Sequence, residues 1–77
     1  MAKARPPRTA SPVVREMMAI IDARKLHHQR LSMDAGLTRH TIAHWRHGKN
    51  APTLFGFECV AQILGYRVAL VPLEPAE

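Results

Sequence analysis

The sequence predicts an all-α fold, a compact bundle of four to five helices, with one short β-strand near the C-terminus. Two observations lead to this class. Apolar residues recur at spacings of three and four along most of residues 12–64, as in helices that bury one face. Residue types that begin helices (serine, threonine, proline) and end them (glycine) divide this stretch into short segments. A chain of 77 residues corresponds to a single domain.

Residues 12–25 are expected to form the first helix. Ser11 suits the N-cap position, and Pro12 suits the first helical position. The apolar side chains of this segment share one helix face: Val13, Val14, Met17, Met18, Ile21 and Leu26. Residues 1–10 contain basic residues and prolines but almost no large apolar side chains, which predicts a flexible basic arm.

A short second helix is expected over residues 28–35. Leu31 and Ala35 are four residues apart, so both face inward. Gly36 follows directly, and glycine readily adopts the left-handed conformation that ends many helices. Leu37 then fills the turn.

The third helix is predicted over residues 39–47. Thr38 precedes it as a candidate N-cap, and Gly48 ends it. Residues 49–52, which include a proline, form a loop.

The fourth helix is predicted over residues 54–64, between an N-cap at Thr53 and the glycine Gly65. Its apolar residues at helical spacing are Leu54, Phe57, Val60, Ala61 and Leu64. Residues 66–71 are apolar and partly β-branched and are bounded by Pro72, so they predict a short strand.

The second and third helices indicate a helix-turn-helix spanning roughly residues 29–47. Small residues are needed where the two helices meet, and Ser32 and Ala35 supply them. Gly36 lets the backbone turn without a side-chain clash. The wedge between the helices is filled by Leu37, Ile42 and Trp45. Trp45 could instead stack on a base, but its position beside Ile42 on the helical wheel favours the core.

Positive charge is concentrated in the first part of the chain. Residues 1–50 contain ten of the eleven lysines and arginines and three acidic residues, a net charge of +7. Residues 51–77 contain one arginine and three acidic residues, a net charge of −2. This concentration of positive charge suits binding to the negatively charged phosphate backbone of a nucleic acid. Lys3, Arg5 and Arg8 of the arm either remain in solvent or lie along phosphates or in the minor groove.

The exposed face of the third helix suits the major groove of DNA. A helical wheel places three histidines opposite Ile42 and Trp45, with two arginines on one flank and a threonine on the other. Arg39 can bind guanine O6 and N7 in bidentate fashion, and His40 and His44 can donate to bases. We therefore predict that bases are read by Arg39, His40 and His44. The predicted contacts to the DNA backbone from this helix are Thr41, Arg46 and His47.

The stretch from Leu26 to Lys49, with Pro52-Thr53-Leu54 and the ending Leu64-Gly65, resembles the lambda-repressor-like (XRE-type) helix-turn-helix family. The resemblance covers about residues 12–65. Its most specific elements are Ala35-Gly36-Leu37-Thr38, Thr41-Ile42, Gly48-Lys49 and Leu64-Gly65. It implies a compact bundle of four or five helices that binds operator DNA as a dimer and regulates transcription.

The resemblance also implies roles for single residues. Arg39, His40 and His44 match the base-reading positions of the family. His28 stands where the family usually has a glutamine that contacts a phosphate. Lys49, Asn50 and the amides near Thr53 match the loop and helix start that hold the DNA backbone. Arg46 replaces the usual acidic residue before the glycine turn, which implies the loss of an internal ion pair and added positive charge near DNA.

The C-terminal strand has no partner within one chain. Pairing with the same strand of a second copy about a twofold axis would satisfy its backbone. The dimer would use Tyr66, Val68 and Leu70 on one side of the strand, and it would read a palindromic operator. Alternatively, residues 66–71 fold back over the first helix as an extended tail. In this division, residues 1–10 are the arm, 11–65 the DNA-binding domain and 66–77 the dimerisation element.

Other chemistry has little support in the sequence. The spacing of His40, His44 and His47 could bridge a zinc ion, but no cysteine or acidic residue completes the four ligands of a structural site. We expect no metal, no cofactor and no enzymatic activity, because nucleophile–base pairs and glycine-rich phosphate loops are lacking. One cysteine and no long apolar run predict a cytoplasmic protein without membrane contact.

The sequence therefore predicts a dimeric, sequence-specific transcriptional regulator that binds double-stranded DNA, most simply as a repressor. One alternative is the antitoxin of a toxin–antitoxin pair, which would bind its toxin through the apolar C-terminal segment. Another is a protein-interaction module that keeps the fold without binding DNA.

Overall fold

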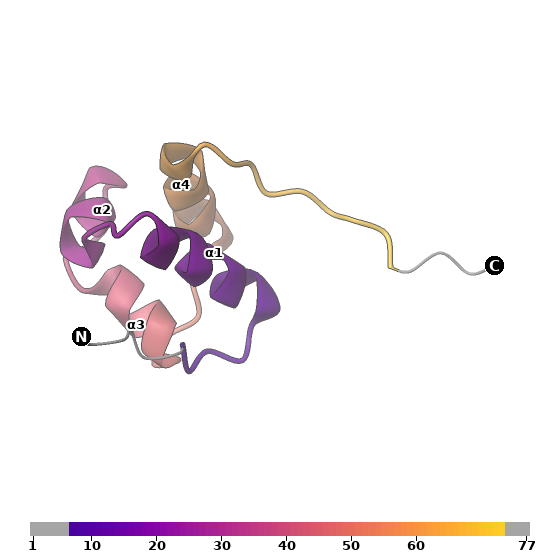
Figure 1. The fold of residues 1–77 in the computed structure, drawn as a ribbon, viewed down its shortest axis with the longest axis horizontal. Helices are drawn as coiled ribbons and strands as arrows, with labels where there is room; N and C mark the ends of the chain where they lie inside the picture. The colour runs from indigo at the N-terminus through magenta and orange to yellow at the C-terminus, as the bar shows by residue number, and fades with distance from the viewer. Residues whose placement is uncertain (1–6, 74–77) are drawn as a thin grey trace.

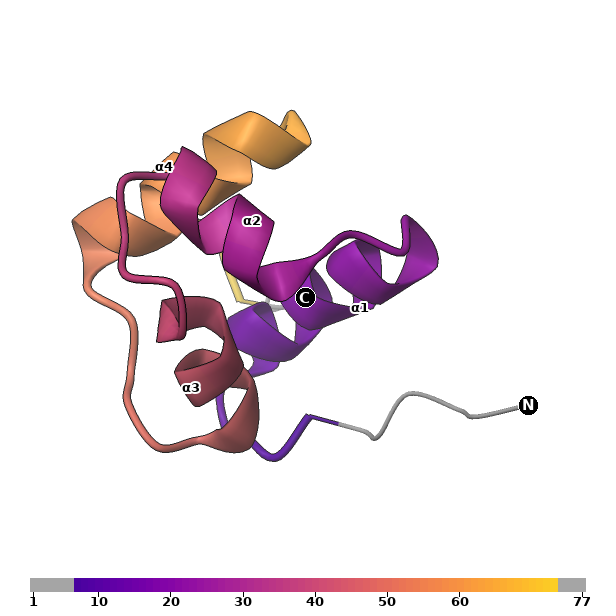
Figure 2. The same cartoon turned by 90° about the vertical axis from the view of Figure 1, so that its left-hand side faces the viewer.

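Within residues 7–73, four helices form where the apolar spacing predicts them, which confirms the all-α class. The computed structural model describes residues 7–73, and its helices are α1 (Pro12–Ala23), α2 (His28–Asp34), α3 (Thr41–His47) and α4 (Leu54–Leu64). Figure 1 shows α2 and α3 at one end of the molecule and the C-terminal segment leaving at the other. In Figure 2, α2 and α3 face the viewer and the C-terminal segment lies behind them. Within the described residues, every helix is too short or too polar to cross a membrane.

Two helices begin at the predicted side-chain caps. The Ser11 hydroxyl accepts a hydrogen bond from the amide of Val14 at 3.4 Å, and Pro12 occupies the first turn of α1. The Thr53 hydroxyl accepts from the amide of Gly56 at 3.0 Å at the start of α4. Each cap satisfies an amide that has no partner within its own helix.

The start of α3 differs from the prediction by two residues. The helix begins at Thr41, and His40 occupies the cap position without a side-chain hydrogen bond. Thr38 is not the cap, because its hydroxyl lies 2.6 Å from the hydroxyl of Thr41 instead of at a backbone amide. Arg39 and His40 therefore form a turn before α3. At α2, by contrast, an unpredicted cap appears, in which Nδ1 of His27 accepts from a backbone amide at 3.4 Å.

All four helices end in the same hydrogen-bonded arrangement. A residue with positive φ follows each helix. The amide of this residue donates a hydrogen bond to the carbonyl three positions earlier in the chain, and the amide of the next residue donates to the carbonyl five positions before itself. These residues are Lys25, Gly36, Gly48 and Gly65. Lys25, at φ 55°, cannot continue a right-handed helix, so α1 ends at Ala23 and not at the predicted residue 25.

The core lies between α1, α3 and α4, with Leu31 added from α2. Its buried apolar side chains are Val14, Met17, Met18, Ile21, Leu31, Ile42, Trp45, Phe57, Val60, Ala61 and Leu64. The rings of Trp45 and Phe57 pack with their centroids 6.1 Å apart, which confirms the core interpretation of the tryptophan. Leu54, predicted on the inward face of α4, is instead exposed.

The chain before α1 is attached to the end of α3. The amides of Arg8 and Thr9 both donate to the carbonyl oxygen of Arg46, at 2.8 and 3.3 Å. Thr9 is buried, and its own carbonyl accepts from Nε of Arg15 at 2.9 Å. Residues 8 and 9 of the predicted arm are therefore part of the folded domain, whereas Lys3 and Arg5 lie outside the described residues.

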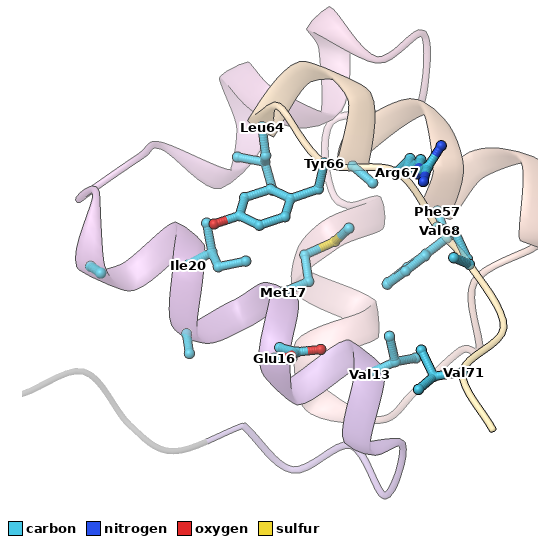
Figure 3. Close-up of a pocket in the computed structure, with 14 residues that line it drawn as sticks. Val13, Glu16, Met17, Ile20, Phe57, Leu64, Tyr66, Arg67, Val68 and Val71 are labelled. Atoms are coloured by element: carbon cyan, nitrogen blue, oxygen red, sulfur yellow. The ribbon is translucent and has the colours of Figure 1, made fainter. Parts of the chain in front are cut away.

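The predicted C-terminal strand is wrong. Residues 66–73 are extended but unpaired, since the described part of the chain offers no second strand. Tyr66 is held at the base of this segment by Arg24, whose guanidinium lies 5.7 Å from the ring centroid. The same guanidinium donates to the carbonyl of Leu64 at 2.9 Å. The segment then runs beside α1 with a groove between them (Figure 3), and its last apolar side chains are exposed.

Candidate nucleic-acid interface

The turn between α2 and α3 is fixed by a hydrogen bond between the two helices. The hydroxyl of Ser32, which is fully buried, accepts from the amide of Ile42 at 3.2 Å. This amide lies in the first turn of α3, where it has no acceptor in its own helix. Position 32 therefore requires a side chain that is small and that also carries a hydroxyl group. Ile42 is itself fully buried, so the orientation of α3 about its axis is set.

Polar side chains cover the face of α3 that points away from the core. Arg39 and His40 are exposed in the preceding turn, and His44 and Thr41 are half-buried. The imidazole rings of His40 and His44 lie 6.3 Å apart. The structure thus brings His40 and His44 close together, and Arg39 precedes them in the exposed turn. Their cationic and hydrogen-bonding groups suit a partner rich in acceptors.

The loop after α3 continues this surface. Nδ1 of His44 lies 3.5 Å from Nδ2 of Asn50, and Lys49 and Asn50 are both exposed, as is His47. A hollow of about 590 Å³ separates the loop from α3. It is lined by Leu37, Thr41, Trp45, Lys49, Asn50, Ala51 and Thr53. The first turn of α4 starts at its edge, where backbone amides favour an anion.

Arg46 does not lie on the exposed surface with its neighbours. Its guanidinium forms two hydrogen bonds to the carboxylate of Asp22 on α1, with Nη1–Oδ1 and Nη2–Oδ2 distances of 3.0 and 2.9 Å. The side chain is only 8% exposed. The expected loss of an internal ion pair is therefore wrong, because the acidic partner comes from α1. Arg46 therefore positions α3 against α1 and does not contribute its guanidinium to the exposed surface.

His28 also turns part of its side chain inward. Its Nε2 atom is buried and has no hydrogen-bond partner among the described residues. Burial lowers the pKa of this imidazole, and the positive charge of Arg46 lowers it further, whereas the carboxylate of Asp22 raises it. The lowered pKa favours the neutral form of the ring relative to a free histidine, and since Nε2 is buried, a contact from His28 to a ligand would have to use Nδ1.

Two residues that fix the interface are not evident from the sequence. One feature of the sequence could have identified Asp22. It follows the buried Met18 by four residues, so it lies at the edge of the apolar face of α1. Ser32 is recognisable as a small residue, but its role as an acceptor for α3 depends on the packing of α2.

The candidate interface therefore consists of the turn before α3, the outer face of α3, the loop after it and the start of α4. It presents exposed cations and donors on a rigid support. Comparison of the chain with protein-family models, with curated proteins and with solved structures gave no match.

Proposed function

We propose that the protein is a sequence-specific DNA-binding regulator of transcription. In this proposal α2, the turn and α3 act as a helix-turn-helix of the lambda-repressor-like type, and α3 enters the major groove. A short domain that occupies an operator would act most simply as a repressor.

The main support is the contrast between the two sides of α3. Its inner side is held by the hydrogen bond from Ile42 to Ser32, by the ion pair of Arg46 and by the buried Trp45. Its outer side presents polar groups to solvent, among them His44, whose Nδ1 lies 3.5 Å from Nδ2 of Asn50. Recognition of bases requires this combination, because side chains must be offered to base edges from a fixed backbone.

The proposed roles follow the position of each residue. Arg39, His40 and His44 would contact base edges. Thr41, His47, Lys49, Asn50 and the amides near Thr53 would contact phosphates, which fixes the register on the duplex without carrying sequence information. Arg8 stands where the chain before α1 meets α3, so a basic segment before it could follow the DNA backbone.

The decisive experiment is the selection of binding sites from a random duplex pool, followed by affinity measurements at one salt concentration. We expect the selected site to bind about 10³-fold or more tightly than scrambled DNA. Uniform, steeply salt-dependent binding to both DNAs would contradict sequence-specific recognition, because it would reflect phosphate contacts alone.

A further inference from the structure

All five histidines of the chain lie in one part of the fold, from the N-cap of α2 to the last residue of α3. This is the end of the molecule that faces the viewer in Figure 2. Residues 27–50 also contain four lysines and arginines and one acidic residue, a net charge of +3 when the histidines are neutral. Because a free histidine titrates near pH 6.5, the positive charge of this part of the surface changes over the neutral pH range.

His40 and His44 are neighbours on the candidate interface, with ring centroids 6.3 Å apart. The other exposed cations of the turn and the loop are Arg39 and Lys49. Among the described residues, both ion pairs join an arginine to an aspartate, so neither imidazole has a carboxylate partner, and the first turn of α4 contains no acidic residue. Protonated rings on this surface therefore repel one another and the nearby cations, and a polyanion that approaches them relieves the repulsion.

The contact of His44 with the loop after α3 uses the neutral form of its ring. Nδ1 of His44 lies 3.5 Å from Nδ2 of Asn50. An amide nitrogen can only donate, so in this contact Nδ1 accepts and carries no proton. In the protonated ring both nitrogens donate, which matches the acceptors of DNA, the phosphate oxygens and the N7 and O6 atoms of guanine. DNA therefore favours the form of the ring that the contact with Asn50 disfavours.

His47 and His28 differ in their access to a partner. His47, the last residue of α3, is exposed and can take up a proton at a phosphate contact. The Nε2 atom of His28 is buried without a partner among the described residues. Burial lowers the pKa of His28 most, the charges of Arg46, His27 and His47 lower it further, and the carboxylate of Asp22 raises it. Protonation of His28 therefore acts against folding and is separate from the response of the exposed rings.

We propose that DNA binding is coupled to proton uptake, so that His40, His44 and His47 take up protons when the duplex docks. The inference rests on the proposed function and adds to it the regulation of the same site by pH. Phosphates and base acceptors beside these rings favour their charged form, whereas in the free protein the rings face other cations. Each proton taken up changes the affinity by up to tenfold per pH unit, so the affinity for DNA rises by at least about tenfold between pH 8 and pH 6.

The test is the affinity of the full chain for the selected duplex at pH 8, 7 and 6, at one salt concentration. Calorimetry at pH 7 in two buffers of different ionisation enthalpy counts the protons, and we expect an uptake of about one or more per chain. The double variant His40→Asn/His44→Gln keeps polar side chains that do not titrate, so it should lose about half or more of the pH dependence, whatever its affinity at pH 8. Circular dichroism at each pH verifies that the helices persist.

His27→Asn is the matched control. His27 is exposed but precedes α2, outside the candidate interface, and asparagine also serves as an N-cap, so this variant should keep the pH dependence of the wild type. Sequence-specific binding that is equally tight at pH 8 and pH 6 would overturn the inference and leave the proposed function standing, and so would an unchanged pH dependence in the double variant. If no duplex were selected at either pH, the proposed function itself would fail, and this inference with it.

Discussion

The guanidinium of Arg46 lies 2.9–3.0 Å from both carboxylate oxygens of Asp22, and this pair fixes α3 against α1. We expect Asp22→Asn to lower the free energy of unfolding by about 2 kcal/mol. This is less than the roughly 3–5 kcal/mol for a fully buried pair, because Asp22 is one-third exposed. Urea unfolding measures the loss. The control is Asp34→Asn, which removes an exposed pair with Arg30 at 3.8 Å and should cost about 0.5 kcal/mol or less. Equal losses in the two variants would refute the special role of Arg46.

The hydrogen bond from Ile42 to Ser32 yields a second prediction. Ser32→Ala removes the acceptor and leaves a buried amide unsatisfied, so it should destabilise the fold by roughly 1–3 kcal/mol. Thr38→Ala is the control, since it removes a hydroxyl contact that is exposed, and its effect in the same urea titration should be smaller. A larger loss from Thr38→Ala would mean that the start of α3 is held mainly by the turn.

Lys25 is the one described residue other than glycine with a positive φ. Lys25→Gly should stabilise the protein by a few tenths to about 1 kcal/mol, because relief of the left-handed strain outweighs the added freedom of the unfolded chain. Gly65→Ala is the converse test. A Cβ at position 65 would have no atom within 4 Å, so a loss of stability would come from the positive φ of this residue and not from a steric clash. Thermal melts of both variants should shift in opposite directions; shifts in the same direction would contradict the assignment.

Acid should destabilise the fold through His28. Its pKa is lowered in the folded protein, first by burial and then by Arg46. Below a pH of about 6.5 the unfolded chain therefore binds a proton that the folded protein does not, and the free energy of unfolding falls by at most about 1.4 kcal/mol per pH unit. The fall ends once His28 is protonated in the folded state too.

Urea unfolding between pH 8 and pH 5 measures this slope. The His28→Gln variant keeps a polar side chain that does not titrate, so its stability should depend less on pH in the same range. Identical slopes in the variant and the wild type would exclude His28 as the cause.

Arg39 tests the proposed reading of bases. Arg39→Ala should reduce affinity for the selected site by about 1–3 kcal/mol and relax its sequence preference at one position. Arg39→Lys is the matched control, because it keeps the charge but loses the bidentate geometry. It should retain binding to scrambled DNA and lose discrimination, as measured by competition at constant salt. Retained discrimination in both variants would exclude Arg39 from base contact.

The helices could be predicted from the sequence because their signals are local. The caps at Ser11 and Thr53 and the glycines after α2, α3 and α4 act within a few residues of where they stand. His40 and His44 lie close together as the sequence spacing predicts, although His40 is in the turn before α3 and not in the helix.

Two of the errors concern contacts between distant segments. The inward turn of Arg46 depends on Asp22, which is 24 residues away in the sequence. Residues 66–71 form no strand because residues 7–73 contain no partner strand, an absence that is also evident in the sequence but that the local β-propensity of the segment does not take into account. Two other errors are local. The cap shifts from Thr38 to His40, where a hydroxyl pair competes with capping, and α1 ends at Ala23 because Lys25 has a positive φ.

The main chain and side chain of Arg46 together join three parts of the protein. The carbonyl receives the amides of Arg8 and Thr9, and the guanidinium holds α1 through Asp22. The chain before α1 is consequently not a fraying end. The amides of Arg8 and Thr9 are shielded from exchange with solvent while this carbonyl accepts from them, so their exchange rates report whether the chain before α1 stays docked on the end of α3.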